Sequence, residues 1–420
     1  MVKRYFTNPI FLSVIFLCII FYSNLFSISF QKSYDSVFYK DDIVEISGKL
    51  LSSPVKSSSG KNYSANFELL FVKDFKNSKA NATGKSTILI PSILVEAHFP
   101  GKLYTLINKK NAFLYEAGGN YTFKGKFFGD FFIVENCLEN TWEKNIFGKI
   151  DYFRALCRLQ FKRLMHSWNG AGGLLLSLLS GQREYTESSV SESFKNSGLS
   201  HILALSGMHL SMFSAIAIFF GERINRKKIT FIIRIIALII FVWFAGFSPS
   251  LLRAFICSIL LIFASMASVE KPDMIIILCF SFIFQSIISP SDIKNYGFIL
   301  SYGALFGILL TNNFFLRIYS FFTPKIIASS LSSSTGAQIF TAPISLKLFG
   351  TFSPIGIIAT TVISPLISIF IYSGLFFIII SLIFPILSSY SGILLNFEYT
   401  IIKYLVGFFS LAPRISFESP

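Results

Sequence analysis

The sequence predicts an α-helical polytopic membrane protein with an N-terminal transmembrane anchor and a small all-β domain, on three observations. Of the 420 residues, 53% are hydrophobic and 14% are charged, whereas about a quarter of the residues in a soluble domain are charged. Apolar runs separated by short polar connections fill the second half of the chain. Residues 35–150 instead contain short alternating segments. A composition this apolar excludes an ordinary soluble globule.

An apolar run at residues 9–30 predicts the anchor, because it is long enough to cross a bilayer. Lys3 and Arg4 precede it, and no small-x-small cleavage site occurs before Phe30, which favours an uncleaved anchor over a signal peptide. The two cations predict that the N-terminus stays in the cytoplasm. Residues 1–34 are then the anchor, and the chain that follows it lies on the outer side of the membrane.

Residues 35–150 alternate apolar with polar side chains and are punctuated by Gly, Asn, Ser and Pro, which predicts a small all-β domain. Gly129-Asp130 predicts a tight hairpin turn between two of the strands. The strand count suits an OB-like barrel, a fold that often binds single-stranded nucleic acid. The predicted strands are Asp42–Lys49, Asn66–Lys73, Ser86–His98, Leu103–Ile107, Tyr121–Phe128 and Phe131–Cys137.

Residues 151–197 connect this domain to the membrane core. Residues 151–166 predict a basic amphipathic helix, which lies either at the membrane surface or against the β domain. Its basic side chains are Arg154, Arg158, Lys162 and Arg163, and its apolar side chains are Phe153, Leu156, Leu159, Phe161 and Leu164. Residues 171–181 are apolar but about half as long as a membrane span, which predicts a re-entrant or packed half-helix.

Residues 198–420 form the predicted membrane core, and positive charges set its orientation. Arg223, Arg226, Lys227 and Lys228 cluster after the first span, whereas the connection at residues 247–250 carries no charge. The basic connection is therefore predicted to be cytoplasmic and the uncharged one external. The expected spans lie near residues 200–219, 231–247, 250–268, 273–289, 296–316, 336–348 joined to 353–370, and 368–387, followed by an amphipathic stretch at 391–411.

The net charge of +15 fits nucleic acid or anionic lipid as a partner, and it also fits the lysines and arginines that gather in cytoplasmic loops. A disulfide between Cys137 and Cys157 is left open, because a sequence does not give the Cα separation that a bridge needs. No phosphate loop of the form G-x-x-x-x-G-K-[ST] occurs, so the chain is not expected to be its own ATP motor. No cofactor is expected.

Residues 198–210 read GLSHILALSGMHL and place two of the four histidines inside the start of a predicted span. Polar groups at such a position are costly and usually functional. At about 100° per residue, Ser206 and His209 are neighbours on this predicted span. The other side carries a stripe of small residues for close helix packing, formed by Ser200, Ala204, Gly207, Ser211 and Ser214.

Three further polar residues lie in predicted spans. Arg253 has no acid on its own helix, so its guanidinium meets water, an acid or a phosphate, or else it extends to the external interface. Ser301 forms a small face with Gly303 and Gly307, for which helix packing is the simpler interpretation. Gln338 predicts a buried amide that needs hydrogen-bond partners or a wet cavity.

The pattern G-L-S-H-x-L-A-x-S-G-x-H at residues 198–209 resembles the signature of the ComEC competence family. Three further stretches agree with that family in order and approximate spacing: SPSLLRA at 248–254, GFILSYG at 297–303 and QIFTAPISLKLFG at 338–350. The chain departs from the family pattern at Gln182-Arg183, where Asp-Arg is usual, at Ile299, where Gln is frequent, and at Thr360-Thr361, where Asn is frequent.

This resemblance implies a channel, and not an enzyme, that carries single-stranded DNA across the bacterial inner membrane during natural transformation. It places the β domain in the periplasm. The implied partners are a periplasmic DNA receptor, a cytoplasmic ATP-driven helicase-like protein and membrane lipid, and a homo-oligomer is left open. The residues expected to line the channel are Gly198, His201, Ser206, Gly207, His209, Arg253, Ser301 and Gln338, and the lysines expected to contact DNA are Lys73, Lys76, Lys109, Lys110, Lys124 and Lys126.

An intramembrane serine hydrolase, with Ser206 as nucleophile and His209 as its base, is the alternative. No acid is placed to orient the imidazole, which weighs against it. Long ComEC proteins also carry a metallo-β-lactamase-like domain, whose metal site needs several converging His and Asp ligands. Because no histidine follows His209, the chain is expected to be a short form without that domain, without a metal and without nuclease activity.

Overall fold

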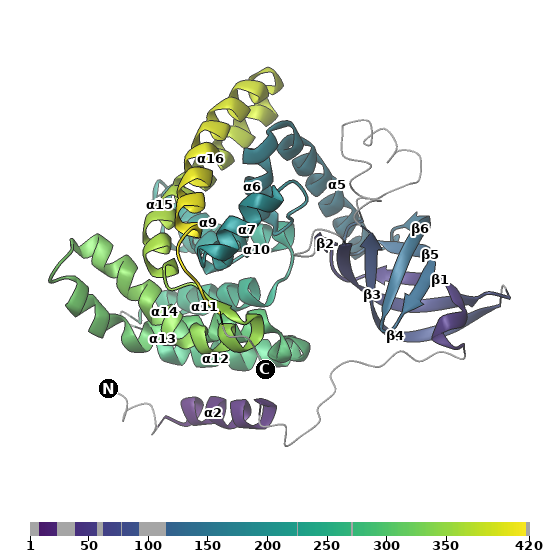
Figure 1. The fold of residues 1–420 in the computed structure, drawn as a ribbon, viewed down its shortest axis with the longest axis horizontal. Coiled ribbons are helices and arrows are strands. Elements are labelled where there is room, and N and C mark those ends of the chain that lie inside the picture. Colours follow the sequence, from purple (N-terminus) through teal and green to yellow (C-terminus); the bar gives the residue numbers. More distant parts are fainter. Residues whose placement is uncertain are drawn as a thin grey trace. The chain divides into compact units, whose positions relative to one another are not determined.

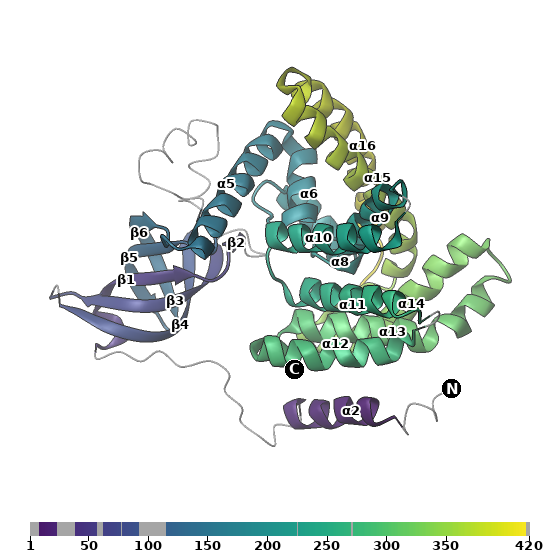
Figure 2. The ribbon, with the colours of Figure 1, turned by 180° about the vertical axis from the view of Figure 1, so that it is seen from behind.

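The computed structural model describes residues 8–22, 38–56, 62–76, 78–91, 115–224, 226–269 and 272–416. The chain divides into two compact units, whose elements are drawn in Figures 1 and 2. The membrane unit comprises Met1–Ile28, Trp168–Gly181 and Thr186–Pro420. The β unit comprises Ser29–Ser167 and Gln182–Tyr185.

A small barrel of strands forms the body of the β unit. The strand order is β1-β5-β6-β4-β3-β2, and β1 also pairs with β3, so that the sheet closes on itself. Strands β4 and β6 run parallel, and the other neighbouring strands of the sheet pair antiparallel. The strands are β1 (Ile43–Leu50), β2 (Val55–Lys56), β3 (Asn62–Asp74), β4 (Lys79–Pro91), β5 (Asn120–Phe128) and β6 (Phe131–Thr141), preceded by a 3-10 turn, η1 (Lys40–Asp42).

Alternation of side chains, clearest on β5, places one face of the sheet in the barrel core. On β5, Phe123 and Phe127 are buried in the barrel, whereas Lys124 and Lys126 are exposed. The buried rings contact one another across the core, and the centroids of Phe67 and Phe123 lie 5.5 Å apart. Because burial of such rings removes large apolar surfaces from water, it supplies much of the stability of a small barrel.

Most of the strands agree with the sequence prediction. The turn at Gly129-Asp130 is confirmed, because Gly129 has a φ of +59° and Phe128 pairs with Phe131 on either side of it. Strand β2 is too short to leave a periodic signal, so the sequence does not predict it. The predicted strand Leu103–Ile107, and residues 92–98 of the predicted strand Ser86–His98, lie outside the described residues.

Helix α5 (Ile146–Ser167) completes the β unit. It begins earlier than the predicted helix at 151–166, because the Asn145 side chain accepts a hydrogen bond from the Gly148 N–H at 2.6 Å and so acts as its N-cap. Its basic face turns toward the barrel, as described below. Cys157 on α5 and Cys137 on β6 are both free thiols, so the disulfide left open by the sequence is not formed.

The membrane unit is built from helices of unequal length. Helices α11, α12 and α13 pack side by side in both views (Figures 1 and 2). The helices are α2 (Pro9–Tyr22), α6 (Asn169–Ser180), α7 (Ser188–Asn196), α8 (Ser200–Leu203), α9 (Gly207–Glu222), α10 (Lys227–Ala245), α11 (Pro249–Met266), α12 (Met274–Ile288), α13 (Tyr296–Tyr319), α14 (Lys325–Phe349), α15 (Gly356–Ile383) and α16 (Ser388–Ser410).

Five helical segments within the described residues are long and apolar enough to cross a membrane: α10, α11, α13, α15 and Pro385–Ser410, which includes α16. Their number and composition make the chain a multi-pass membrane protein. Helix α2 is a shorter apolar helix, and its Tyr22 hydroxyl donates to the Ile293 carbonyl at 2.7 Å. Residues 23–30 of the predicted anchor lie outside the described part of the chain.

Three predicted spans differ from the structure. The span predicted at 200–219 is broken into α8 and α9. The segments predicted at 353–370 and 368–387 form one continuous helix, α15, which contains Pro365. The segment predicted at 336–348 is only the end of α14, because a run of serines between Ser329 and Ser334 hides its first half from any hydropathy pattern.

The serines of α14 have partners on the preceding helix. Ser332 and Ser333 both donate to the Asn312 side-chain carbonyl of α13, at 2.5 and 3.3 Å. Thr335 lies 3.1 Å from the Tyr319 hydroxyl. Helices α13 and α14 therefore form a hairpin held by polar contacts, and the same contacts explain why a polar segment is stable inside an apolar unit. Helix α6 also agrees with its prediction as a packed half-helix, because every residue from Ala171 to Ser180 is buried.

Candidate functional site

The candidate site begins where the predicted first span is interrupted. Gly198 has a φ of +74°, in the region that favours glycine, and it precedes the short helix α8. Ala204 and Ser206 are extended, with ψ angles of 139° and 174°, so the helix does not continue between α8 and α9. The predicted stripe that joins Ser200 and Ala204 to Gly207 is therefore wrong, because these residues do not share a helix.

Ser206 is the N-cap of α9, and His209 completes the cap. The Ser206 backbone N–H donates to His209 Nδ1 at 3.2 Å, and Ser206 Oγ lies 3.2 Å from the same nitrogen. Ser206 and His209 form a capping box, in which the His209 side chain accepts from the Ser206 backbone N–H and the Ser206 side chain accepts from the His209 backbone N–H, so that backbone groups at the helix start are satisfied. Because Nδ1 is an acceptor, the proton of a neutral ring lies on Nε2, which is buried and has no hydrogen-bond partner in the described part of the chain.

Arg253 lies beside the start of α9. A Cβ atom placed on Gly207 would be 3.8 Å from Arg253 Nη2 and 3.4 Å from the Ala254 Cβ. Helix α11 brings the arginine here, because it starts at Pro249 after Ser248, whose side chain accepts from the Leu251 N–H. The Nε of Arg253 is buried without a hydrogen-bond partner, and no ion pair among the described residues includes its guanidinium.

A polar network ties α11 to α12 and α13 near this arginine. The Arg253 guanidinium lies 5.8 Å from the centroid of the Tyr302 ring. The Tyr302 hydroxyl donates to Gln285 Oε1 at 3.0 Å, and Gln285 Nε2 donates to the Pro249 carbonyl at 3.0 Å. Ser301 donates to Ser250 Oγ at 3.1 Å, so it bonds between helices as well as packing.

Gly198 and Gln338 both lie close to Gly356. A Cβ atom placed on Gly356 would lie 2.7 Å from Gln338 Nε2 and 3.4 Å from the Gly198 Cα. The start of α15 therefore accommodates no side chain between these two residues. The Oε1 of Gln338 is buried without a hydrogen-bond partner within the described residues. His201 is exposed, and its Nδ1 lies 3.2 Å from the Gly198 carbonyl.

Arg234 is a functional candidate that the sequence reasoning missed. It lies inside the apolar helix α10, and its Nε donates to Ser214 Oγ of α9 at 3.2 Å. Ser214 and Gly207 are two turns apart, about 10 Å along the axis, and seven residues bring them to the same side of a helix. Arg234 and Arg253 thus approach one side of α9 from two neighbouring helices. A charge within an apolar span was the signal available for Arg234, as it was for Arg253.

Gln285 and Tyr302 were also missed. Gln285 is fully buried and Tyr302 is nearly so. A lone amide in the apolar sequence MIIILCFSFIFQSII was a usable signal for Gln285. For Tyr302 the sequence offers no comparable signal, because its hydroxyl partners come from another helix.

The predicted DNA-contacting lysines lie on the outside of the barrel, where acids accompany some of them. Glu45 of β1 lies between Lys73 of β3 and Lys124 of β5, and the Lys73–Glu45 distance is 3.5 Å. Lys76, Lys124 and Lys126 are exposed. Lys109 and Lys110 lie outside the described residues. The described lysines therefore do not form one uninterrupted cationic strip.

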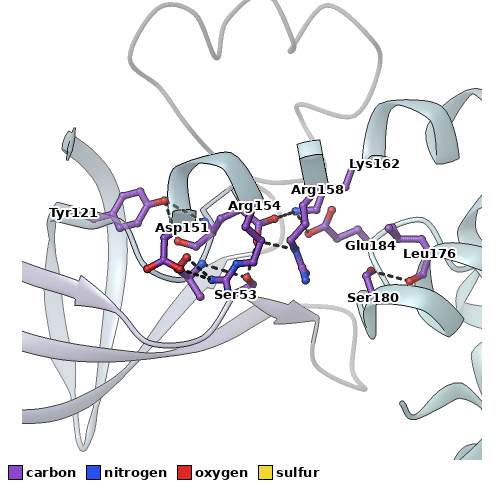
Figure 3. Close-up of polar contacts among 11 residues, drawn as sticks. Ser53, Tyr121, Asp151, Arg154, Arg158, Lys162, Leu176, Ser180 and Glu184 are labelled. Carbon is purple, nitrogen blue, oxygen red and sulfur yellow. Dashed lines mark hydrogen bonds and ion pairs between the residues drawn. The ribbon is translucent and has the colours of Figure 1, made fainter. Parts of the chain in front are cut away.

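A buried charge cluster joins α5 to the rest of the β unit (Figure 3). The Glu116 carboxylate contacts Arg158 Nε at 3.0 Å and Lys162 Nζ at 2.7 Å, and it accepts from the Ser53 hydroxyl at 2.6 Å. Glu184 lies 3.7 Å from the same Lys162. The four charged residues Glu116, Arg158, Lys162 and Glu184, named here the charge cluster, are all less than 10% exposed.

The pKa values of the two acids in the charge cluster are shifted in opposite directions. Burial alone would raise the pKa of Glu116, but the neighbouring Arg158 and Lys162 cations and hydrogen bonds from Lys162 and Ser53 lower it to about 2. Burial raises the pKa of the Glu184 carboxyl, because Lys162 offsets that effect only in part and Glu116 adds to it. Arg158 and Lys162 of α5 are thus paired with the β unit's own acids.

Comparison with known proteins identifies the family. The model of the family described as Competence protein matches residues 178–419. ComE operon protein 3 of Bacillus subtilis (strain 168) is 28% identical over 204 residues, which cover 48% of this chain and 25% of that protein. No solved structure gives a significant match. Because the family match covers more than half of the chain and includes the motifs around Gly198, Arg253 and Gln338, the chain belongs to the ComEC competence family.

Proposed function

We propose that this chain carries single-stranded DNA across the inner membrane of a bacterium during natural transformation, with residues 198–420 as its channel domain. Membership of the competence family supports a role in DNA uptake. The observation that carries the finer proposal is Arg253, whose guanidinium lies beside Gly207 without an acid to pair it among the described residues. A phosphate that passes this point supplies the missing anion, and arginine binds phosphate through a planar fork of donors.

Passage of a polymer needs weak contacts that repeat, because a single strong site would hold the strand. Arg253 and Arg234 on one side of α9 fit this need, and Gly207 leaves space beside the first of them. In this proposal, the energy that moves the DNA comes from a partner protein and not from this chain. A periplasmic DNA receptor and a cytoplasmic ATP-driven helicase-like protein are the proposed partners.

The proposed orientation follows from the basic connections. The connection between α9 and α10 contains Arg223 and Arg226, and Lys227 and Lys228 begin α10. Because positive residues favour the cytoplasmic side, α9 and α10 meet in the cytoplasm and the connection between α10 and α11 faces outward. The N-terminus is then cytoplasmic, and the β unit is periplasmic.

The barrel is proposed to be OB-like. Strands β1, β5, β6, β4 and β3 form a closed ring of five, in which β1 pairs with β3, and β2 pairs at its edge. This ring, with a single parallel pair between β4 and β6, supports the assignment. We expect weak binding of single-stranded DNA without sequence preference, because Glu45 offsets part of the charge of Lys73 and Lys124. A fragment of residues 35–167, which retains α5, can be titrated with oligothymidylate at several salt concentrations. An affinity that does not change with salt contradicts the electrostatic account.

Deletion of the gene tests the function as a whole. The deletion strain is expected to bind as much total DNA as its parent but to yield no transformants, because surface binding precedes passage through the inner membrane. Complementation with the wild-type gene should restore transformation. Normal transformation of the deletion strain would refute the proposal.

The hydrolase alternative has one observation in its favour, the 3.2 Å contact between Ser206 Oγ and His209 Nδ1. The capping box accounts for that contact without catalysis, because the Ser206 backbone N–H donates to the same nitrogen. A catalytic base would also need an orienting group on its second nitrogen, and His209 Nε2 has none among the described residues. Covalent labelling of Ser206 by a serine-directed probe would favour the hydrolase.

A further inference from the structure

Helix α5 has its polar side turned inward. Arg158 and Lys162 are 4% and 1% exposed, and both contact Glu116. Arg154 donates to the Ala117 carbonyl at 2.7 Å. Three basic residues one or two turns apart thus attach the same side of α5 to the rest of the β unit (Figure 3). The rotation of α5 about its own axis is therefore fixed.

The first half of α5 exposes large apolar side chains that take no part in these contacts. Ile146 is 75% exposed, Ile150 is 44% exposed and Phe153 is 59% exposed, and their spacing of i, i+4 and i+7 puts them on one stripe. Leu156, three residues after Phe153, and Phe147, next to Ile146, are also exposed. These five residues, Ile146, Phe147, Ile150, Phe153 and Leu156, are named here the α5 stripe. Apolar surface of this kind is costly in water, at about 25 cal/mol per Å².

The surroundings of the α5 stripe are those of a membrane interface. Trp142 and Tyr152 lie at the start of α5, with ring centroids 5.7 Å apart, and these two residue types concentrate at headgroup level. Lys144 and Lys149 are exposed nearby, where they can meet anionic headgroups. The residue that follows α5 is Trp168, the first residue of the membrane unit's second segment. The chain therefore enters the membrane unit directly from this helix.

We propose that the α5 stripe lies in the lipid interface of the bilayer, with α5 parallel to the membrane surface and its charged side bound to the β barrel. Membrane attachment then uses the apolar side chains and not the arginines and lysines that the sequence suggests for it, because Arg158 and Lys162 are taken up by Glu116. The lipid surface thereby sets the orientation of the barrel. This inference does not rest on DNA transport.

Lipid fits the α5 stripe better than a protein partner does. The exposed stripe residues offer no polar group that a partner protein could recognise, whereas specific interfaces carry about one hydrogen bond per 100–200 Å². The exposed charges beside the stripe at Lys144 and Lys149 are positive, which matches anionic lipid.

A native thiol allows a direct test, because Cys157 continues the line of Ile146, Ile150 and Phe153 at i+11. In full-length protein, the other four cysteines are replaced by serine or alanine, and Cys157 is labelled with a polarity-sensitive fluorophore. The protein is reconstituted into phosphatidylcholine vesicles containing phosphatidylglycerol, with or without bromine on the acyl chains. We expect blue-shifted emission and loss of fluorescence in the brominated vesicles.

Two matched variants complete the experiment. A label at Lys126→Cys, on an exposed barrel position, should keep its intensity in brominated vesicles. Ile150→Asp should restore the Cys157 label's intensity, whereas Ile150→Leu should leave it quenched. Equal quenching of the Cys157 and Lys126→Cys labels would overturn the proposal. So would cross-linking of Cys157 between two copies in place of quenching, because that result would assign the stripe to a second copy of the chain.

Discussion

At the scale of single residues, the question for Arg253 is whether its guanidinium binds passing phosphate or only extends to the membrane interface. A guanidinium inside an apolar helix unit needs an anion or water, and Arg253 has its Nε buried without a partner. We predict that Arg253→Ala abolishes entry of labelled DNA while leaving membrane insertion unchanged. Arg253→Lys should recover part of the activity, because it keeps the charge but loses the planar fork.

Arg317 provides the control for that experiment, since it is an exposed arginine in the last turn of α13. Arg317→Ala should transport normally. A folded Arg253→Ala protein that also transports normally would mean that Arg253 only extends to the membrane interface.

The start of α9 gives a second prediction at this scale, about shape. A Cβ on Gly207 would meet Ala254 at an ordinary contact distance of 3.4 Å, so Gly207→Ala should be tolerated. Gly207→Leu would drive a larger side chain toward Arg253, and we predict that it blocks transformation. Ser206→Ala removes a capping side chain, which costs about 1 kcal/mol, and should reduce transformation only slightly.

Transformation frequency, normalised to the amount of protein in the membrane, measures all three variants. A Ser206→Ala protein that is as inactive as the Gly207→Leu protein would show that the serine does more than cap α9.

At the scale of elements, the charge cluster makes a prediction about stability. Glu116→Gln removes the carboxylate that the buried Arg158 and Lys162 share, and breaking a buried ion pair in this way typically costs about 3–5 kcal/mol. Glu184→Gln should cost less, because burial already raises the pKa of Glu184 and so favours its neutral form. The free energy of unfolding of the β unit, followed by hydrogen exchange on β5 in the full chain, distinguishes the two variants. Equal losses would contradict the assignment.

The two acids also contribute in opposite ways to the pH dependence of the stability of the β unit. The pKa of Glu116 is lowered to about 2 in the fold, so its contribution is present above its ordinary pKa and is lost as the pH falls toward 2. The pKa of Glu184 is raised, so its contribution is present at low pH and is lost as the pH rises through the folded value. Glu116→Gln should therefore reduce the acid sensitivity of the β unit, and an unchanged acid transition would contradict this.

At this scale the sequence predicts those elements whose pattern lies within one segment of the chain, and it misses features that depend on contacts between distant segments. The barrel strands and most apolar helices follow from alternation and from long apolar runs, and Arg253 and Gln338 stand out as polar side chains in apolar spans. Gly198 was found through the motif that resembles the family. The break between α8 and α9 could not be read in the same way, because a serine cap looks like a small residue within a span. The direction of α5 was equally hidden, since its acid Glu116 lies far away in the sequence.

At the scale of the whole molecule, Arg253 and Arg234 should act as two contacts of one path along α9. If each binds a phosphate, each releases counterions, so the slope of log affinity against log salt should fall by about 0.7 per arginine for a single strand. We therefore predict for the full-length chain, titrated with oligothymidylate, that Arg234→Gln and Arg253→Gln each lower the slope by about 0.7 and that together they lower it by about 1.4.

Lysine at either position should keep the slope, and Arg317→Gln should leave it unchanged, since Arg317 lies at the far end of another helix. A purely structural role for Arg234 would weaken binding through misfolding without this specific change in salt dependence, and Arg234→Lys would not restore it. If the wild-type chain binds the oligonucleotide with a clear salt slope that Arg234→Gln does not alter, the path does not include Arg234, and the channel proposal then rests on Arg253 alone. If the wild-type chain does not bind at all, it is the transport function itself that must be abandoned.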